Sequence, residues 1–173
     1  MLTKKDGQQI KVQYRGEVKD FYTSLIGNFQ ADNLLCAMGL ALASGIPFNL
    51  LIKHAPRITG VRGRMELVNK ASAGGAIYID YAHTPDALRS VLLALRSHTS
   101  GKLYLVFGCG GERDTGKRPL MGRIAAELAD HVFVTDDNPR GEDPSSIRSA
   151  ILAVCKNSSD IGNREEAISC AIG

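Results

Sequence analysis

The chain has 173 residues, 44% of them hydrophobic, and a formal net charge of +3, so it can bury one good core. Its Lys and Arg residues are interspersed with acids, and the apolar run LLCAMGLALA is too short to span a bilayer, which argues against nucleic-acid and membrane partners. The four cysteines have no CxxC spacing and no secretory signal opens the chain, so we expect reduced thiols in a cytoplasmic protein.

Residues 1–60 contain too few elements for a complete domain. The alternating run QIKVQY predicts a strand, and the small-residue run ADNLLCAMGLALASG predicts a helix that ends at Gly45 and Pro47. A short second helix, FNLLIKHA, follows. One strand and two helices cannot bury both faces of a sheet, so we expect this segment to be a piece of a larger domain.

Residues 61–173 form a second unit, with the seam in the Gly- and Arg-rich stretch PRITGVRGR. The runs RMELVNK and AIYIDY predict a hairpin across ASAGG, and a helix from Pro85 to about Ser97 follows. The remaining predicted elements are strand KLYLVFG, a helix opened by Pro119, strand HVFVTD, a helix entered at Asp143, and a last helix capped by Asn163. This alternation predicts an α/β fold with a doubly wound, Rossmann-like and mostly parallel sheet.

The ends of the predicted strands carry many polar side chains. The segments concerned are DYAHTPD (80–86), GCGGERDTGKR (108–118) and TDDNPRGED (135–143). In an open parallel sheet the carboxyl ends of the strands share one edge, and ligands bind there. We therefore expect these three loops to converge on one binding site.

The glycine loop resembles a phosphate-binding loop but fails one requirement. From Gly111 it reads G-x-x-x-x-G-K, with Gly116 and Lys117 at the positions that would hold phosphates. A P-loop then needs Ser or Thr to hold magnesium, whereas Arg118 stands there. The glycine loop must therefore serve another purpose.

The three loops together offer charges of both signs. Their charged residues are Arg113, Lys117, Arg118 and Arg140 with Asp80, Asp114, Asp136 and Asp137. Guanidinium groups bind carboxylates bidentately and carboxylates bind ammonium groups, so this mixture suits a zwitterion better than a phosphate. Pro139 fixes a backbone dihedral angle and biases Asn138 towards an extended conformation, which would present Arg140 predictably.

Simpler interpretations stay open for several of these residues. Asp137 to Arg140 can be only a turn, Asp143 only a helix cap, and His83 an ordinary loop histidine. Cys109 has no legible arrangement of histidine and acid around it, so a small buried residue is favoured over a nucleophile.

Four collinear motifs carry a resemblance to a known family. In chain order they are GRMELV, DYAHTPDAL, VFGCGGERDTGKRPLMG and VTDDNPRGEDP. In this order and spacing they resemble the C-terminal domain of the Mur ligases, and most closely that of the members that add diaminopimelate. The stretch GNFQADNLLCAMGLALASG also resembles the tail of that family's central ATPase domain, so the resemblance covers essentially residues 20–173.

The resemblance implies a reaction and its reactants. In the family, ATP phosphorylates the terminal carboxylate of UDP-N-acetylmuramoyl-L-alanyl-D-glutamate, and the amine of meso-diaminopimelate then attacks the acyl phosphate. This amide ligation uses ATP and Mg²⁺, and it makes a peptidoglycan precursor that serves cell wall biogenesis, cell shape and cell division. The implied partners are therefore small molecules: meso-diaminopimelate, ATP and the nucleotide-linked dipeptide.

The resemblance also assigns site residues, motif by motif. The DNPR segment, which is Asp137, Asn138, Pro139 and Arg140, resembles the diaminopimelate recognition motif, with Arg140 expected on the distal carboxylate and Arg113 as a further contact. The positions that resemble nucleotide contacts are Gln30, Asn33, Arg64, Asp80, Tyr81 and His83. Gln30 stands where the family usually has Asn, so its contact with adenine is open. No catalytic residue and no metal ligand is expected within this chain.

Parts of the family's machinery are not in this sequence. The P-loop, the magnesium ligands and a carbamylated lysine belong to the family's central domain, and a uridine-nucleotide-binding domain precedes it. We expect residues 1–60 to be the tail of the central domain and residues 61–173 to be a C-terminal domain truncated before its GKGHE segment. Such a fragment would supply the amino-acid-binding half of the site and would be inactive alone.

Two alternatives to this assignment stay open. The chain can be a stand-alone, non-catalytic amino-acid-binding remnant, or it can belong to a relative that adds lysine. The DNPR segment disfavours lysine, because lysine has no second carboxylate for Arg140 to meet.

Overall fold

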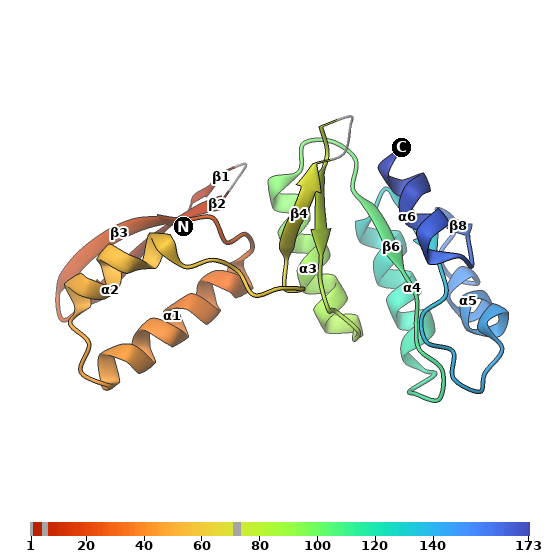
Figure 1. Ribbon diagram of the computed structural model, residues 1–173, viewed down its shortest axis with the longest axis horizontal. Coiled ribbons are helices and arrows are strands. Elements are labelled where there is room, and N and C mark those ends of the chain that lie inside the picture. Colours follow the sequence, from red (N-terminus) through yellow and green to blue (C-terminus); the bar gives the residue numbers. More distant parts are fainter. Residues whose placement is uncertain (1, 5–6, 71–73) are drawn as a thin grey trace.

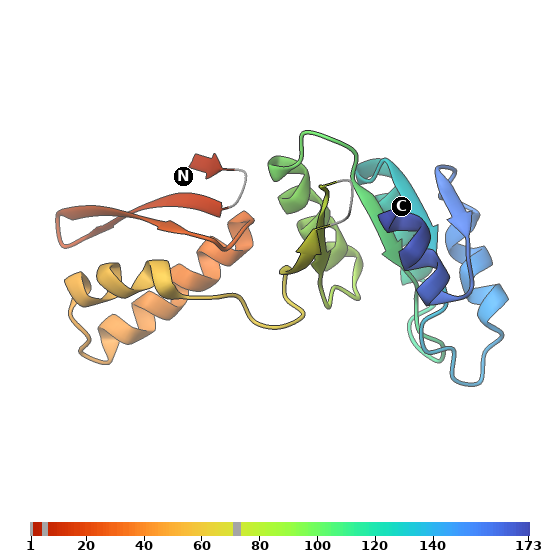
Figure 2. The same cartoon turned by 45° about the horizontal axis from the view of Figure 1, so that its top comes forward.

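The computed structural model describes residues 2–4, 7–70 and 74–173, which form two units joined by a connecting segment (Figure 1). The N-terminal unit has a three-stranded antiparallel sheet in the order β1-β2-β3, with helices against one face (Figure 2). Its elements are β1 (Leu2–Lys4), β2 (Gly7–Tyr14), β3 (Glu17–Thr23), α1 (Asn28–Ala43), α2 (Phe48–His54) and the 3-10 helix η1 (Ala55–Arg57).

The N-terminal core lies between this sheet and helix α1. Ile10 of β2 pairs with Phe21 of β3, and both side chains are buried against Leu34 of α1. The hairpin turns at Arg15 and Gly16, whose φ angles of 49° and 82° give the left-handed backbone that a tight two-residue turn requires. The sequence predicted a single strand here, because Arg-Gly is a weak turn signal and the first half of β3 is polar and exposed.

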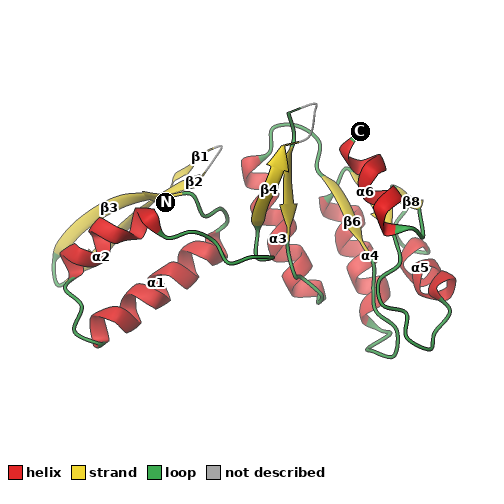
Figure 3. Ribbon diagram, viewed as in Figure 1, coloured by secondary structure: helices red, strands yellow, loops and turns green. Residues whose placement is uncertain are grey.

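The C-terminal unit begins with an antiparallel hairpin and continues as a parallel sheet in the order β6-β7-β8. The hairpin and its helix are β4 (Glu66–Lys70), β5 (Ala76–Ile79) and α3 (Pro85–His98). The parallel part is β6 (Tyr104–Phe107), α4 (Lys117–Leu128), β7 (His131–Val134), α5 (Pro144–Leu152), β8 (Ser158–Asp160) and α6 (Arg164–Ile172). Figure 3 shows this alternation of strand and helix.

The parallel sheet has helices on both faces, as a doubly wound fold requires. Helices α4 and α5 lie on one face and α6 lies on the other (Figures 1 and 2). Val132 and Val134 of β7 are fully buried, and they share one core with Ile151 of α5 and Ala125 of α4. The predicted α/β, Rossmann-like fold with a parallel sheet is confirmed.

Two features of the C-terminal unit differ from the prediction. In the described part of the chain the β4–β5 hairpin is a separate two-stranded sheet and is not hydrogen-bonded to β6. The short strand β8 was not predicted, because Ser158–Asp160 is polar and has no apolar alternation. The hairpin predicted across ASAGG is present on both sides of the loop, although residues 71–73 lie outside the described residues.

A small apolar cluster joins the two units. Ile26, which precedes α1, is buried with Met65, which precedes β4, and with Ala94 of α3. A Cβ on Gly27 would lie 2.7 Å from the Cβ of Ala94, so this close approach depends on glycine. The contact brings the start of α1 beside the start of the hairpin, and this is where several candidate site residues lie.

Candidate ligand-binding site

The three polar loops leave the carboxyl ends of β5, β6 and β7. Strands β6 and β7 are parallel neighbours, so the loops that follow them share one edge of the sheet. The loop after β5 reaches the same edge (Figure 1), and there Lys117 Nζ donates a hydrogen bond to the carbonyl oxygen of His83 at 2.9 Å. The convergence expected from the sequence is therefore present.

Glycines let the loops after β6 and β7 pack backbone against backbone. A Cβ on Gly108 would lie 2.1 Å from the Thr135 carbonyl oxygen, and one on Gly111 would lie 1.9 Å from that of Pro139. The Gly111 N–H donates to the Asn138 carbonyl oxygen at 2.9 Å. The glycine loop is thus built for close contact with the 137–140 segment, which explains its glycines without any phosphate.

Arg140 is held in a defined direction by this contact. Its backbone has a φ of 52°, and its N–H donates to Asn138 Oδ1 at 3.3 Å. Its Nη1 donates to the Gly111 carbonyl oxygen at 2.6 Å. A guanidinium has five N–H donors, so most of those on Arg140 are left for a carboxylate. A Cβ on Gly110 would lie 3.0 Å from Nη1, so this position also favours glycine.

Arg113 lies on the glycine loop and lines the same cleft as Asp137, Asn138 and Arg140. This cleft has a volume of about 2470 Å³ and is lined by residues of the β4–β5 hairpin, α3, β6 and α6. Arg113 is exposed and makes no hydrogen bond or ion pair with the described residues. Two guanidinium groups and a carboxylate therefore line one cleft, a combination that suits a ligand carrying both carboxylate and ammonium groups.

The residues that resemble nucleotide contacts form a second group beside the β4–β5 hairpin. The guanidinium of Arg64 lies 4.9 Å from the centre of the Tyr81 ring, and the ring of His83 meets Tyr81 edge-on at 5.2 Å. Asp80 shapes the loop, because its carboxylate accepts from the Met65 N–H at 2.8 Å and from the Ala82 N–H at 2.7 Å. Tyr81 is 64% exposed, so part of its ring surface is accessible to a ligand although Arg64 lies over the ring.

Gln30 and Asn33 differ from each other in their surroundings. Gln30 is 8% exposed, and its Nε2 donates to the Arg64 carbonyl oxygen at 3.3 Å, so its amide links α1 to the hairpin. Asn33 is exposed on α1 and, among the described residues, makes no hydrogen bond with Arg64, Tyr81 or His83. The geometry brings Gln30, but not Asn33, into this group.

Two charges that the sequence placed on the binding rim have other roles. Arg118 is only 5% exposed and pairs with Glu142 at 2.8 Å, so it lies beneath the loops and not on the rim. Asp136 forms an ion pair with Arg148 of α5. The burial of Arg118 contradicts its expected place on the rim, whereas the Asp136 side chain is 35% exposed with its carboxylate engaged by Arg148. Charge and position in the sequence do not reveal a partner that lies on another element.

Glu142 was missed by sequence reasoning although it ties the two loops together. Its carboxylate accepts from Arg118 Nη2 at 2.8 Å and from the Glu112 N–H at 2.5 Å. The hydrogen bonds from Arg118 and then from Glu112 lower the pKa of Glu142. In return, Glu112 Oε1 accepts from the Gly141 N–H at 3.2 Å. These partners are 24 to 30 residues apart in the chain, and no local pattern signals them.

Three interpretations offered for nearby residues are confirmed. Asp143 caps α5, because its carboxylate accepts from the Ser146 N–H at 3.0 Å. Asn163 caps α6 by accepting from the Glu166 N–H at 3.0 Å. Cys109 is 3% exposed, and burial raises the pKa of its thiol, which keeps it protonated and disfavours a nucleophilic role.

Within residues 2–4, 7–70 and 74–173, no group of three or more His, Cys, Asp or Glu side chains could hold a metal ion. None of the helices in these described ranges is both long and apolar enough to cross a bilayer.

The fold is an open α/β domain whose polar loops converge at the carboxyl ends of its strands. The sequence pattern of the Mur ligase glutamate ligase domain matches residues 63–173, so the chain belongs to the Mur ligase family. The UDP-N-acetylmuramoyl-L-alanyl-D-glutamate–2,6-diaminopimelate ligase of Caulobacter vibrioides is 51% identical over 166 residues, which cover 96% of this chain and 34% of that protein. The chain therefore spans about a third of the length of the curated relatives it matches.

Solved structures that resemble this chain include a ligase with the same name as these relatives. One named as UDP-N-acetylmuramoyl-L-alanyl-D-glutamate–2,6-diaminopimelate ligase is 36% identical with a TM-score of 0.65, covering 94% of this chain and 34% of that chain. The folylpolyglutamate synthase of Mycobacterium tuberculosis, solved with ADP and AMPPCP, has a TM-score of 0.74 at 20% identity and covers 96% of this chain and 38% of that one. At that identity the second likeness concerns the fold alone.

Proposed function

We propose that this chain is part of a cytoplasmic enzyme that joins meso-diaminopimelate to UDP-N-acetylmuramoyl-L-alanyl-D-glutamate in peptidoglycan precursor synthesis. The observation that carries the proposal is the cleft lined by Arg113, Asp137 and Arg140. meso-Diaminopimelate carries an ammonium and a carboxylate at each end, so it needs cations and an anion at fixed separations. The names of the relatives, which are 2,6-diaminopimelate ligases, support the same substrate.

Each side chain of the proposed amino-acid pocket has a separate task. Arg140, already oriented by Gly111, would bind the distal carboxylate through its unused donors. Arg113 would provide a second guanidinium for the substrate, and Asp137 would accept from an ammonium group. Pro139 and Asn138 would fix the backbone that presents Arg140. The pocket would thereby hold the incoming amine in one orientation for attack on the activated carboxylate.

The second group of residues would face the nucleotide. Tyr81 and His83 offer flat surfaces, and Arg64 offers a positive charge beside them. ATP, when bound, would supply the phosphoryl group that turns the dipeptide carboxylate into an acyl phosphate. Gln30 would contribute mainly through its link to Arg64. The described residues contain no group of three or more His, Cys, Asp or Glu side chains that could hold a metal ion, and the chemistry we assign to this chain is substrate binding.

We further infer a division of the chain into two parts. Residues 1–60 would belong to the ATPase domain of the full enzyme, and residues 61–173 to the domain that brings the amino acid. Such a chain would supply the amino-acid-binding half of the site and would not form the amide by itself. Measurable tripeptide synthesis or ATP hydrolysis by the purified 173-residue chain would contradict this division of labour.

A titration followed by NMR tests the proposal. The 173-residue chain is titrated with meso-diaminopimelate and, separately, with L-lysine, which lacks the second carboxylate. We expect shifts of the Gly111 and Arg140 amides with meso-diaminopimelate and none with lysine, and we expect Arg140→Ala to abolish them. Arg123→Ala removes an exposed arginine of α4 outside the cleft and serves as the matched control. Equal binding of both amino acids would favour the lysine-adding relative.

A further inference from the structure

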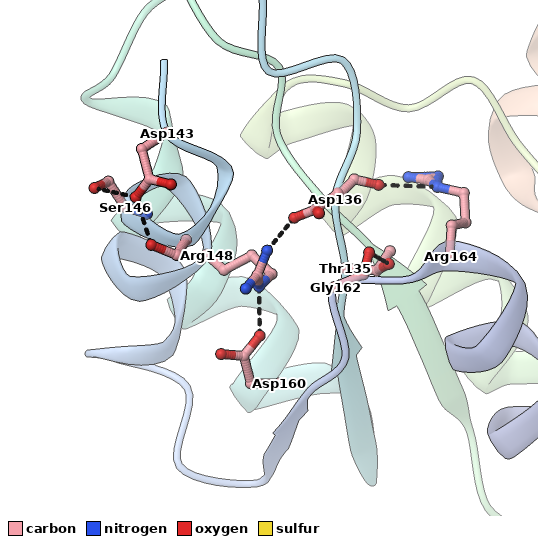
Figure 4. A network of polar contacts seen from close by, with 9 residues as sticks. Thr135, Asp136, Asp143, Ser146, Arg148, Asp160, Gly162 and Arg164 are labelled. Carbon is pink, nitrogen blue, oxygen red and sulfur yellow. Dashed lines mark hydrogen bonds and ion pairs between the residues drawn. The ribbon is translucent and has the colours of Figure 1, made fainter.

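Asp136 lies immediately before the 137–140 segment, and all of its polar groups are engaged (Figure 4). Its N–H donates to the Gly162 carbonyl oxygen at 3.0 Å, and its own carbonyl oxygen accepts from Arg164 Nε at 3.2 Å. Its carboxylate forms an ion pair with Arg148 Nη1. The residue that opens the pocket segment is therefore fixed by three partners, which lie on α5, on α6 and in the loop between β8 and α6.

Arg148 is the centre of this network. Its side chain is 15% exposed and projects from α5 between two carboxylates, so that Nη1 meets Asp136 and Nε meets Asp160 at 2.5 Å. Figure 4 shows the guanidinium lying between the carboxylates of Asp136 and Asp160. A Cβ on Gly162 would lie 3.1 Å from Nη1, so the backbone there leaves room for the guanidinium. The hydrogen bonds that Arg148 donates to Asp136 and then to Asp160 raise its pKa, which keeps it charged.

The other side of the same segment is held by the glycine loop. The Gly111 N–H donates to the Asn138 carbonyl oxygen at 2.9 Å, and the Gly111 carbonyl oxygen accepts from Arg140 at 2.6 Å. Residues 137–140 thus run between two anchors, the Asp136 network and the glycine loop. Because a guanidinium can bridge two carboxylates with fixed geometry, the Arg148 anchor controls direction as well as position.

We propose that Arg148 is a positioning residue for the amino-acid pocket: it fixes Asp136 and thereby the direction in which Asp137 and Arg140 face the cleft. The role of the pocket in binding meso-diaminopimelate rests on the proposed function, whereas the mechanical role of Arg148 does not. Arg148 does not line the cleft, so its effect on a ligand must pass through Asp136. A simple surface ion pair would instead change overall stability a little and leave the loop unchanged.

The test uses Arg148→Met, which removes the charge and keeps the apolar stem. The matched control is Arg89→Met. Arg89 of α3 makes a bidentate ion pair with Glu127 near the end of α4, and neither residue belongs to the glycine loop or to the 137–140 segment. Hydrogen–deuterium exchange is followed at the Gly111 amide and at the Leu92 amide, whose residue is 1% exposed in the core. We expect Arg148→Met to accelerate Gly111 exchange about tenfold relative to Leu92, and Arg89→Met to leave the ratio unchanged.

Two further variants, one of Arg148 and one of its partner Asp160, separate a positioning role from a general loss of stability. Arg148→Lys keeps one charge but cannot bridge two carboxylates in a fork, so its exchange ratio should fall between wild type and Arg148→Met. Asp160→Asn removes the more exposed partner and should give a smaller change in the same direction. An unchanged Gly111-to-Leu92 ratio in Arg148→Met, or equal acceleration at both amides, would overturn the proposal.

The ligand readout distinguishes this inference from the proposed function. If the wild-type chain binds meso-diaminopimelate, Arg148→Met should raise its Kd although it removes no atom from the cleft. If the wild-type chain does not bind meso-diaminopimelate, the assignment of the pocket to this chain fails, while the exchange ratio still decides whether Arg148 positions the loop. Binding that stays unchanged in a variant whose Gly111 exchange has risen would also overturn the positioning role.

Discussion

Arg118 and Glu142 form an ion pair beneath the candidate site, with Nη2 2.8 Å from Oε1. The side chain of Arg118 is 6% exposed and that of Glu142 is 31% exposed. The same carboxylate oxygen also accepts from the Glu112 N–H. One side chain therefore links the first turn of α4 and the glycine loop to the loop that follows β7.

The unequal burial of this pair predicts an unequal response to substitution. Glu142→Met leaves a buried guanidinium without a counter-charge, whereas Arg118→Met leaves a carboxylate that can reach water. We therefore expect Glu142→Met to lower the midpoint of thermal unfolding more than Arg118→Met does. Circular dichroism melts of the two variants and of wild type measure this order. A larger loss in Arg118→Met would show that packing of the arginine stem matters more than charge.

Acid should remove the contribution of the Glu142 carboxylate to the free energy of unfolding. The hydrogen bonds from Arg118 and Glu112 hold its pKa below the ordinary value of 4.5, so the contribution is present above that value and is lost as the pH falls through the lower folded-state pKa. Glu142→Gln lacks this titration. Urea unfolding at about pH 6 and about pH 3 should thus give a stability difference between wild type and Glu142→Gln that shrinks in acid. A difference that stays constant or grows would contradict the assignment.

Gly111→Ala should disrupt the pocket by a steric clash. The new Cβ would lie 1.9 Å from the Pro139 carbonyl oxygen, so the 137–140 segment would have to move. We expect a loss of about 1–3 kcal/mol in the free energy of unfolding and a loss of meso-diaminopimelate binding. Gly101→Ala is the matched control, because a Cβ there meets nothing within 4 Å, and it should stay within about 0.5 kcal/mol of wild type.

The order of elements and the place of the site could be predicted from the sequence because both follow local rules. Apolar runs such as KLYLVFG give strands, and polar residues at their ends mark the edge of a parallel sheet. The strand β8 could not be predicted, since Ser158–Asp160 is a strand only because β7 supplies its hydrogen bonds. Secondary structure that depends on a neighbour leaves no pattern in its own residues.

The roles of individual charges were harder to predict than their location. Arg113 and Arg140 lie in loops at the edge of the sheet, and Arg118 lies in the first turn of α4. Arg118 is buried against Glu142, whereas Arg113 is exposed. What separates them is the direction of the backbone at the start of α4, which turns Arg118 inward. The pairing of Asp136 with Arg148 likewise depends on how α5 packs against β7. Such contacts are set by tertiary packing, which a single sequence does not state.

The cysteines divide into two classes that chemical modification should separate. Cys36 and Cys170 are exposed, whereas Cys109 and Cys155 are buried and burial raises the pKa of both thiols. With Ellman's reagent near neutral pH we expect two thiols to react quickly and two to react at least about 100-fold more slowly, since the buried pair must wait for local opening.

The packing around Cys109 permits a sharper form of the same experiment. Its Sγ lies 3.8 Å from the Sδ of Met121, which is 2% exposed in α4 and helps to cover the thiol. Met121→Ala should open a cavity beside Cys109 and cost about 2–5 kcal/mol of stability. Modification of Cys109, followed by mass spectrometry of its peptide, should then accelerate more than that of Cys155. Equal acceleration of both would mean that the thiols react only through global unfolding.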